Sequence, residues 1–436
     1  MRLAVVFTIV AGAALAETPL PVGGGDYAPV SMDEARLGQL LFYDPILSGN
    51  RNISCATCHH PRFGTSDGLS LGIGEGGVGL GPDRRPDPTN MPEQRVPRNA
   101  SSLFNLGAKE FTRLFDDGRI ETDPRRPSGL RTPLEDEMVK GFASVLSAQT
   151  MFPVLSPDEM AGHYQESDVS KAVREGLITG PGGAWDILSR RVAAIPEYRL
   201  MFAATYPEIA AGRPIAFTDI SNAIAAFVAF EWRADNSPFD AMLRGGPALP
   251  TMAQAGMDLF YGEAGCATCH SGKFQTDQDF HAMGEPQIGP GKAERFENHS
   301  RDMGRMRVTN RAEDAYAFRT PSLRNVTVTG PWGHSGAWSD LAAFLHHHAD
   351  PSAGLGGYKR AQAILPEMPG VKSDWAILES AQETAAIELA ARPGRALSDS
   401  EVAEIIAFLD SLRDQRAIDG RLGVPETVPS GLPVDR

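Results

Sequence analysis

The 436-residue chain has no excess of basic residues. Its 41 lysines and arginines are outnumbered by 55 aspartates and glutamates, which gives a formal net charge of −14. Proteins that bind nucleic acid need basic patches to neutralise phosphate, so this balance argues against a nucleic-acid partner. An acidic surface suits a small basic protein partner better.

The N-terminus lacks an apolar run long enough to span a bilayer, which would take about 20 residues. Arg2 precedes a short apolar stretch that reaches Ala14-Leu15-Ala16, and Glu17 with two nearby prolines ends it. This pattern predicts a cleaved secretory signal peptide over residues 1–16 and therefore export to the periplasm, with no membrane span in the mature protein.

Cysteine is also scarce, and all four cysteines lie in two identical pentapeptides, Cys55-Ala56-Thr57-Cys58-His59 and Cys266-Ala267-Thr268-Cys269-His270. Four cysteines in an exported chain would ordinarily predict two disulfides. In C-x-x-C-H, however, two thiols one helical turn apart form thioethers to heme, and the adjacent histidine faces the iron. A thioredoxin-like motif would not require the histidine, and zinc sites usually space it away from the cysteines. We therefore expect two covalently bound hemes c, with His59 and His270 as proximal iron ligands.

The surroundings of the two motifs repeat as well. Amphipathic helices expected over 34–44 and 253–262 precede the motifs, and apolar helices over 219–227 and 400–409 close the two halves. This predicts a mainly α fold with two class I cytochrome c-like helical domains in tandem. The domain junction is expected in a segment rich in proline and glycine, 236–250, which gives domains over 17–240 and 241–436. Long irregular loops are expected over 72–97 and 284–304, where they would shape access to a cofactor.

Further strings of the sequence resemble the bacterial diheme cytochrome c peroxidase family, which includes the MauG-type enzymes, and they span nearly the whole mature chain. The strings are Arg98-Asn99, Asp117-Gly118-Arg119, Phe230-Glu231, Arg319-Thr320-Pro321-Ser322-Leu323-Arg324-Asn325-Val326 and Thr329-Gly330-Pro331-Trp332-Gly333-His334-Ser335-Gly336. The resemblance implies a peroxidatic N-terminal domain and an electron-transfer C-terminal domain.

The family carries its active site on a glutamine and a glutamate ten residues apart, with two prolines at fixed places between them. Gln149 and Glu159, with Pro153 and Pro157, match that spacing. By resemblance, Glu159 is the acid/base over the open face of the first heme and Gln149 its hydrogen-bonding neighbour. From the residues alone, a surface glutamate at a helix start is the alternative, since Ser156 to Glu159 would form a good N-terminus.

The resemblance also addresses the axial ligands, which decide whether an iron passes electrons or binds peroxide. Ile73 occupies the place of a removable distal histidine in many members, so we expect an open first heme. His60 is expected to be structural or solvent-facing. On the second heme, the family's distal position falls on His348, with His347 or neither as alternatives, because His346 to His348 could form a solvated helix end. The fallback ligands are Met283, Met303 and Met306.

The family places a calcium ion between the hemes, and Asn99, Thr329 and Pro331 match its ligand pattern. Asp116 stands where the family has an inter-heme tryptophan, which leaves Trp232 or Trp332 as substitutes in an electron relay. The stretch from 116 to 149 is longer than in the family, and it could form a partner-docking loop or a rim of the heme pocket.

Together these features predict a periplasmic oxidoreductase that reduces hydrogen peroxide with electrons from a small cytochrome c or a cupredoxin. The alternative is a MauG-like enzyme that uses peroxide to oxidise a partner protein. A third hypothesis is a plain electron carrier with both irons closed. Gln149 and Glu159 argue against it. Members of the family are often dimers, so a homodimer stays open.

Overall fold

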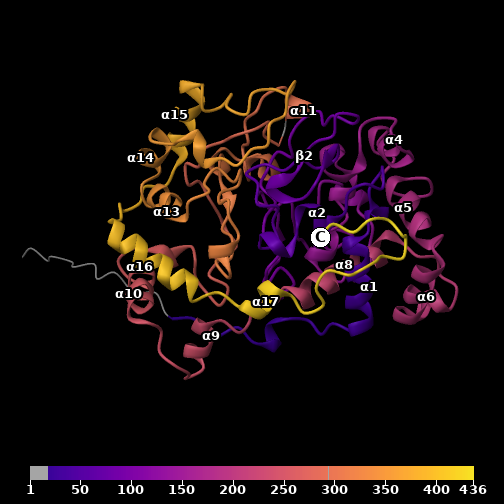
Figure 1. Ribbon diagram of the computed structural model, residues 1–436, viewed down its shortest axis with the longest axis horizontal. Helices are drawn as coiled ribbons and strands as arrows, with labels where there is room; N and C mark the ends of the chain where they lie inside the picture. The colour runs from indigo at the N-terminus through magenta and orange to yellow at the C-terminus, as the bar shows by residue number, and fades with distance from the viewer. Residues whose placement is uncertain (1–17, 293) are drawn as a thin grey trace, which may run out of the picture.

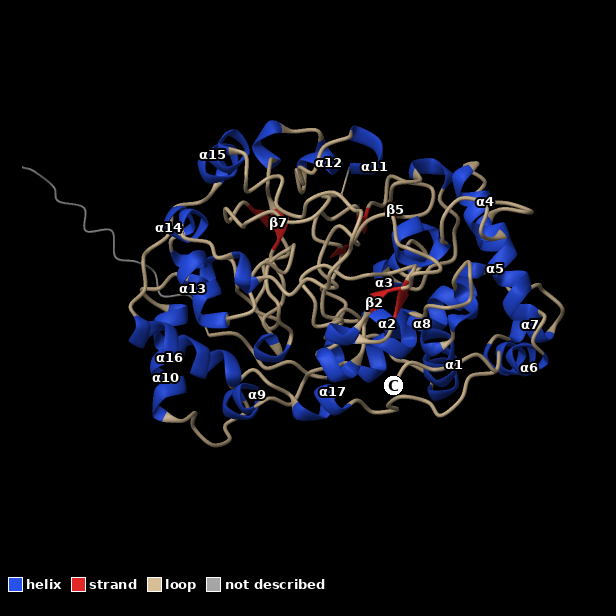
Figure 2. Ribbon diagram, turned by 45° about the horizontal axis from the view of Figure 1, so that its top comes forward, coloured by secondary structure: helices blue, strands red, loops and turns tan. Residues whose placement is uncertain are grey.

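The computed structural model describes residues 18–436 except residue 293, and the expected signal peptide lies outside the described residues. Helices predominate, and long irregular segments connect them (Figure 2). The helices of the first part of the chain are α1 (Met32–Tyr43), α2 (Cys55–Cys58), α3 (Val145–Gln149), α4 (Asp168–Arg174), α5 (Ala184–Ala193), α6 (Pro196–Thr205), α7 (Pro207–Ala210), α8 (Phe217–Glu231) and α9 (Pro238–Leu243). Those of the second part are α10 (Thr251–Tyr261), α11 (Glu294–Glu297), α12 (Met306–Thr309), α13 (Leu341–Ala349), α14 (Pro351–Gly356), α15 (Ala381–Ala390), α16 (Asp399–Asp410) and α17 (Gln415–Asp419).

Helix α1 crosses α8 at close range, and this crossing organises the core of the first half. Ser31 caps α1 by accepting a hydrogen bond from the backbone N–H of Glu34. The buried side chains Leu37, Leu41 and Phe42 share one core with residues of α8, and the ring centroid of Phe42 lies 5.3 Å from that of Phe227. A β-carbon at Gly38 would lie 1.8 Å from the carbonyl oxygen of Ala223, so the contact requires glycine.

The same crossing recurs between α10 and α16 in the second half. A β-carbon at Gly256 would lie 1.8 Å from the carbonyl oxygen of Glu404. In both leading helices a phenylalanine–tyrosine pair begins four residues after the crossing glycine. In the second core, Phe260 packs edge-on against Tyr261 and at a tilt against Phe408. The predicted repeat of leading and closing helices in a mainly α fold is thus confirmed.

Each end of the described chain lies against the opposite half (Figure 1). Near the N-terminus, Asp26 pairs with Lys273 of the second half at 2.7 Å. The backbone N–H of Val22 donates at 3.1 Å to buried Asp240 of α9, a helix whose Phe239 belongs to the second core. The tail after α16 crosses to the first half, where Ala417 and Val428 join the buried core. The predicted boundary after residue 240 falls inside α9 and stays a prediction.

Short strands hold the irregular segments in place. β1 (Gly77–Val78) pairs antiparallel with β2 (Arg85–Pro86), and β6 (Phe280–His281) with β7 (Phe318–Arg319). The start of the long stretch after residue 116 joins an antiparallel sheet in the order β3 (Arg113–Leu114), β4 (Ile120–Thr122) and β5 (Leu130–Arg131), of which β3 comes just before that stretch. The predicted loops 72–97 and 284–304 are largely irregular. Among the residues that the structure describes, no helix is both long and apolar enough to cross a bilayer.

Candidate heme sites

In both C-x-x-C-H motifs, one ring nitrogen of the histidine is hydrogen-bonded to a backbone carbonyl. Cys55 and Cys58 stand one turn apart on α2, and His59 follows directly. Nδ1 of His59 lies 3.0 Å from the carbonyl oxygen of Thr65, and Nδ1 of His270 lies 3.0 Å from that of Gln275. A backbone carbonyl accepts the Nδ1 proton in this arrangement, which leaves Nε2 as the basic nitrogen for a metal. The donor set and its orientation therefore fit a proximal ligand of heme iron in both halves.

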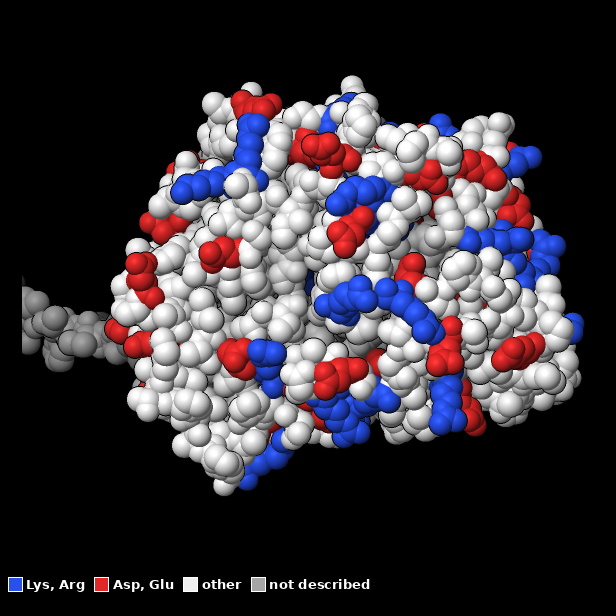
Figure 3. All heavy atoms as spheres, viewed as in Figure 1, with Lys and Arg blue, Asp and Glu red and all other residues white. Residues whose placement is uncertain are grey.

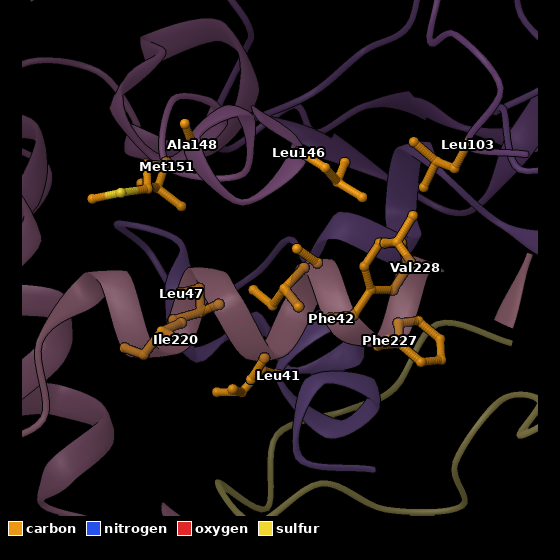
Figure 4. Close-up of a cluster of buried hydrophobic side chains, with 14 of the residues drawn as sticks. Leu41, Phe42, Leu47, Leu103, Leu146, Ala148, Met151, Ile220, Phe227 and Val228 are labelled. Carbon is orange, nitrogen blue, oxygen red and sulfur yellow. The ribbon is translucent and has the colours of Figure 1, made fainter. Parts of the chain in front are cut away.

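A largely apolar cavity adjoins His59 and both cysteines of the first motif. It encloses about 1190 Å³ of empty space, part of it open to solvent. Phe42, Leu103, Leu146 and Val228 belong both to its wall and to the buried core in Figure 4. The first core is thus built around the space that a heme would fill.

Glu159 and Gln149 line this same cavity. Gln149 ends α3, which Ser144 caps by accepting a hydrogen bond from Ser147 N–H at 3.2 Å. Glu159 lies in a single wide turn, Pro157–Ala161, where the Ala161 N–H donates to the Ser156 carbonyl at 2.9 Å. Such π-type turns are frequent at functional sites. The structure therefore brings the two predicted residues to the cavity beside His59. The helix start expected at Ser156 is present as this short turn, and Glu159 in it lines the cavity.

Glu75, which the sequence analysis did not single out, braces this turn. Its side chain is buried, and its backbone N–H donates to the carbonyl of Asp158 at 3.0 Å. One carboxylate oxygen accepts from three side-chain amides at 2.8–3.0 Å, those of Asn50, Asn52 and Asn90. Glu75 thereby ties the segment before the first motif to the turn that carries Glu159. No sequence spacing links these residues, so the hydrogen-bond cluster around Glu75 was not predictable from the sequence alone.

Ile73 and His60 lie close to the first motif but offer the cavity no ligand in this arrangement. The carbonyl of fully buried Ile73 accepts from the Arg84 guanidinium, and an aliphatic side chain cannot bind iron. His60 is buried, and its Nδ1 accepts from the Arg62 N–H at 3.2 Å. Of the two readings for His60, the structural one is correct and the solvent-facing one is wrong.

In the second half, the ring of His348 faces that of His270, with a centroid separation of 6.1 Å. Two imidazole nitrogens about 2 Å from one metal ion on opposite sides put their ring centroids roughly 6 Å apart. Nδ1 of His348 is buried without a hydrogen-bond partner, and burial, together with His270, lowers the pKa of His348 to about 4. A neutral imidazole is the form that binds a metal. The spacing and protonation state fit a distal ligand.

The other two histidines of this helix lie in different surroundings. His347 is buried and stacks on Trp338 with ring centroids 5.1 Å apart. His346 is partly exposed, and its Nε2 lies 3.2 Å from Asp399. Neither shows the geometry of His348 toward His270, so His348 remains the preferred ligand among the three, as a prediction.

The segment between the two sites is rich in buried charge. Asp116, in the place of the family's tryptophan, lines the first cavity, and burial raises its pKa. Its carbonyl accepts from the Arg319 N–H at 2.7 Å, which joins the two halves. Trp232 is buried in the first core against Phe42, and Nε1 of Trp332 donates to the Val326 carbonyl at 3.0 Å. An electron relay through either tryptophan stays a prediction.

The long stretch 116–149 contributes to the wall of the first cavity. Asp116 and Arg119 near its start, and Leu146 and Gln149 at its end, line the cavity, whereas Arg125 in its middle is exposed. Of the two roles left open, a rim of the pocket is the one these positions favour.

The expected calcium ligands lie where the halves meet. The Asn99 N–H donates to the His334 carbonyl at 3.0 Å, and its side chain donates to the Leu69 carbonyl at 2.8 Å. Thr329 and Pro331 belong to the neighbouring segment that leads to His334. The calcium site stays a prediction.

Comparison with known proteins identifies the family. Residues 32–248 match the family model described as di-haem cytochrome c peroxidase. The methylamine utilization protein MauG of Methylorubrum extorquens is 30% identical over 344 residues, covering 78% of this chain and 74% of that protein. The chain belongs to the di-haem cytochrome c peroxidase family. Membership implies two heme groups and oxidoreductase chemistry, and it confirms the resemblance carried by the sequence strings.

Other members of the family show similar agreement. Cytochrome c551 peroxidase of Pseudomonas aeruginosa is 29% identical over 311 residues, covering 71% of this chain and 69% of that protein. The crystal structure of a MauG-like protein associated with microbial copper homeostasis superposes with a TM-score of 0.56 at 25% identity, covering 95% of this chain and 97% of that one. The overall fold is therefore that of the diheme enzymes.

Proposed function

We propose that this protein is a periplasmic peroxidase that reduces hydrogen peroxide to water with electrons from a small cytochrome c or a cupredoxin. The observation that carries the proposal is the convergence of His59, Glu159 and Gln149 on one cavity. A plain electron carrier has no need for an acid/base residue and a carboxamide at an open cofactor face.

The proposed cofactors are two hemes c, attached through Cys55 and Cys58 in the first half and Cys266 and Cys269 in the second. When bound, the hemes would supply the iron that receives peroxide and would pass on the two electrons that the donor provides. The balance is one hydrogen peroxide, two electrons and two protons for two waters.

The residues of the first cavity would carry the proton movements. Glu159 takes the proton of the inner peroxide oxygen and returns it to the outer oxygen, which leaves as water when the O–O bond breaks. Gln149 can donate a hydrogen bond from its amide and so orient the peroxide. The apolar wall formed by Phe42, Leu146 and Val228 limits the water that could compete for the acid/base residue.

The second half would pass electrons. His270 and His348 would close both faces of its iron, and a site with two protein ligands transfers electrons instead of binding peroxide. A calcium ion held at Asn99, Thr329 and Pro331 belongs to the same proposal as a structural element between the halves.

The runner-up is peroxide-dependent oxidation of a partner protein, in the manner that the MauG name of one relative suggests. Ile73 in place of a removable histidine favours it, because the first heme would then be open without activation. Asp116 weighs against it, since a carboxylate cannot serve as an aromatic electron relay.

Steady-state oxidation of a reduced cytochrome c or cupredoxin by hydrogen peroxide tests the proposal. The wild type should turn over, and Glu159→Gln should lose roughly 100- to 10,000-fold in rate with its heme content intact. The exposed control Glu175→Gln should match the wild type. Full turnover by Glu159→Gln would show that the active-site assignment is wrong, and absence of turnover by the wild type would favour the runner-up.

A further inference from the structure

The 284–304 loop of the second half reaches into the first cavity with a lysine. Lys292 lines the cavity together with Glu159 and Gln149, and its Nζ lies 3.8 Å from Oε1 of Glu159. About a quarter of the Lys292 side chain is exposed, at 26%, and the Glu159 side chain is similar at 25%. The pair is therefore partly accessible to solvent.

A second ion pair docks the same loop onto the same turn. The Arg295 guanidinium contacts both carboxylate oxygens of Asp158, with Nε 3.0 Å from Oδ2, and Gln94 donates to that oxygen at 2.9 Å. Arg295 also pairs with Glu93 at 2.6 Å. Two cations three residues apart thus hold two adjacent carboxylates of the first half. This arrangement fixes the position of Lys292 relative to Glu159.

The charges around Lys292 explain why its ammonium needs a partner. Burial and the neighbouring Arg119 and Arg98 lower the pKa of Lys292, whereas Glu159 and Asp117 act in the opposite direction. The carboxylates are therefore what stabilises the cation at this position. A partly dehydrated ion pair of this kind is stronger than an exposed one.

We propose that Lys292 is a positioning residue of the peroxidatic site. Its ammonium is the counter-charge that holds the Glu159 carboxylate in place over the cavity, ready to accept the first proton of hydrogen peroxide. The second half would then supply a side chain to the active site of the first half, as well as electrons. This inference rests on the proposed function and adds to it a residue from outside the N-terminal domain.

Cyanide binding to the oxidised protein separates this role from turnover. Hydrogen cyanide, like hydrogen peroxide, gives up a proton when it binds an open ferric heme, so its association rate depends on the distal base. Lys292→Met should lower the rates of cyanide association and of peroxide reaction by roughly 10- to 100-fold. Lys292→Arg keeps the charge and should restore both rates to within about three-fold of the wild type. The exposed Lys359→Met is the matched control and should leave both rates unchanged.

A double-mutant cycle with Glu159→Gln decides whether Lys292 acts through Glu159. In that background Lys292→Met should change cyanide association by less than about three-fold. An equal loss in both backgrounds would overturn the inference, because Lys292 would then act on another group, such as a heme carboxylate. Unchanged rates in Lys292→Met would also overturn it. If Glu159→Gln itself leaves cyanide association and peroxide reaction unchanged, the proposed function fails first, and that outcome is distinguishable from a failure confined to Lys292. Heme content and the absorption spectrum of each variant establish that it is folded.

Discussion

Acid should lower the folding stability of this protein, in part by protonating one buried carboxylate at the junction of the two halves. The guanidinium of buried Arg98 binds Asp302 through two hydrogen bonds, Nε to Oδ2 at 2.7 Å and Nη2 to Oδ1 at 2.8 Å, and its Nη1 pairs with Asp117 at 2.8 Å. Burial alone would raise the pKa of Asp302, but the charge of Arg98 outweighs it and lowers the pKa from 3.8 to about 2.

The size and sign of the effect follow from this difference in pKa. A carboxylate whose pKa is lower in the folded state stabilises the fold above its unfolded pKa, and the contribution disappears as pH falls through the folded pKa. The difference from 3.8 corresponds to about 2 kcal/mol of unfolding free energy at neutral pH. Roughly half of that is lost between pH 7 and pH 3, and the remainder at lower pH.

Denaturant unfolding of wild type and Asp302→Asn at pH 7 and pH 3 measures this contribution. The variant should be less stable at pH 7, because Arg98 keeps one carboxylate partner where it had two. Its further loss on acidification should be smaller than that of the wild type by about 1 kcal/mol. The exposed Asp258→Asn should lose as much as the wild type. An acid-induced loss in Asp302→Asn equal to that of the wild type would show that Asp302 does not carry this acid dependence.

Two further predictions concern the second half. His348→Ala should convert the second heme to a high-spin spectrum. His347→Ala, which removes the stacking contact with Trp338, should keep the heme low-spin. The opposite pattern would assign the iron ligand to His347. Gly256→Ala should lower the thermal midpoint by the equivalent of about 1–3 kcal/mol, because its β-carbon would lie 1.8 Å from a backbone oxygen of α16. Gly356→Ala, which meets nothing within 4 Å, should keep or raise the midpoint, and equal midpoints for the two variants would contradict the close crossing.

Features of the structure that depend on a short stretch of sequence were predictable. The two pentapeptides fix the attachment sites because cysteine and histidine spacing within one helical turn is a local property. The leading and closing helices were predictable from their apolar periodicity, and α1, α8, α10 and α16 lie where it placed them. Gln149 and Glu159 came from family spacing, and the cavity shows the two side chains together.

Features that depend on distant segments were not predictable. Lys292 lies in an irregular loop of the second half, and nothing in its neighbours along the chain relates it to Glu159. Likewise, the return of Val428 to the first core and the amide cluster on Glu75 bring together residues far apart in sequence. Periodicity and motif spacing describe residues within one element, whereas these contacts depend on how the halves are docked.

Figure 3 shows acidic and basic side chains interspersed on one face of the molecule. The net charge of −14 therefore does not by itself locate a docking site for the electron donor on that face. A donor should be sought through its effect on turnover.

We propose that the two identical attachment motifs hold hemes in unlike sites, the first open beside Glu159 and the second closed by His270 and His348. Electron paramagnetic resonance of the oxidised protein distinguishes open from six-coordinate iron at each heme. We expect high-spin and low-spin signals in equal amounts. Two low-spin hemes would exclude this asymmetry, since the protein would then have no iron available to peroxide.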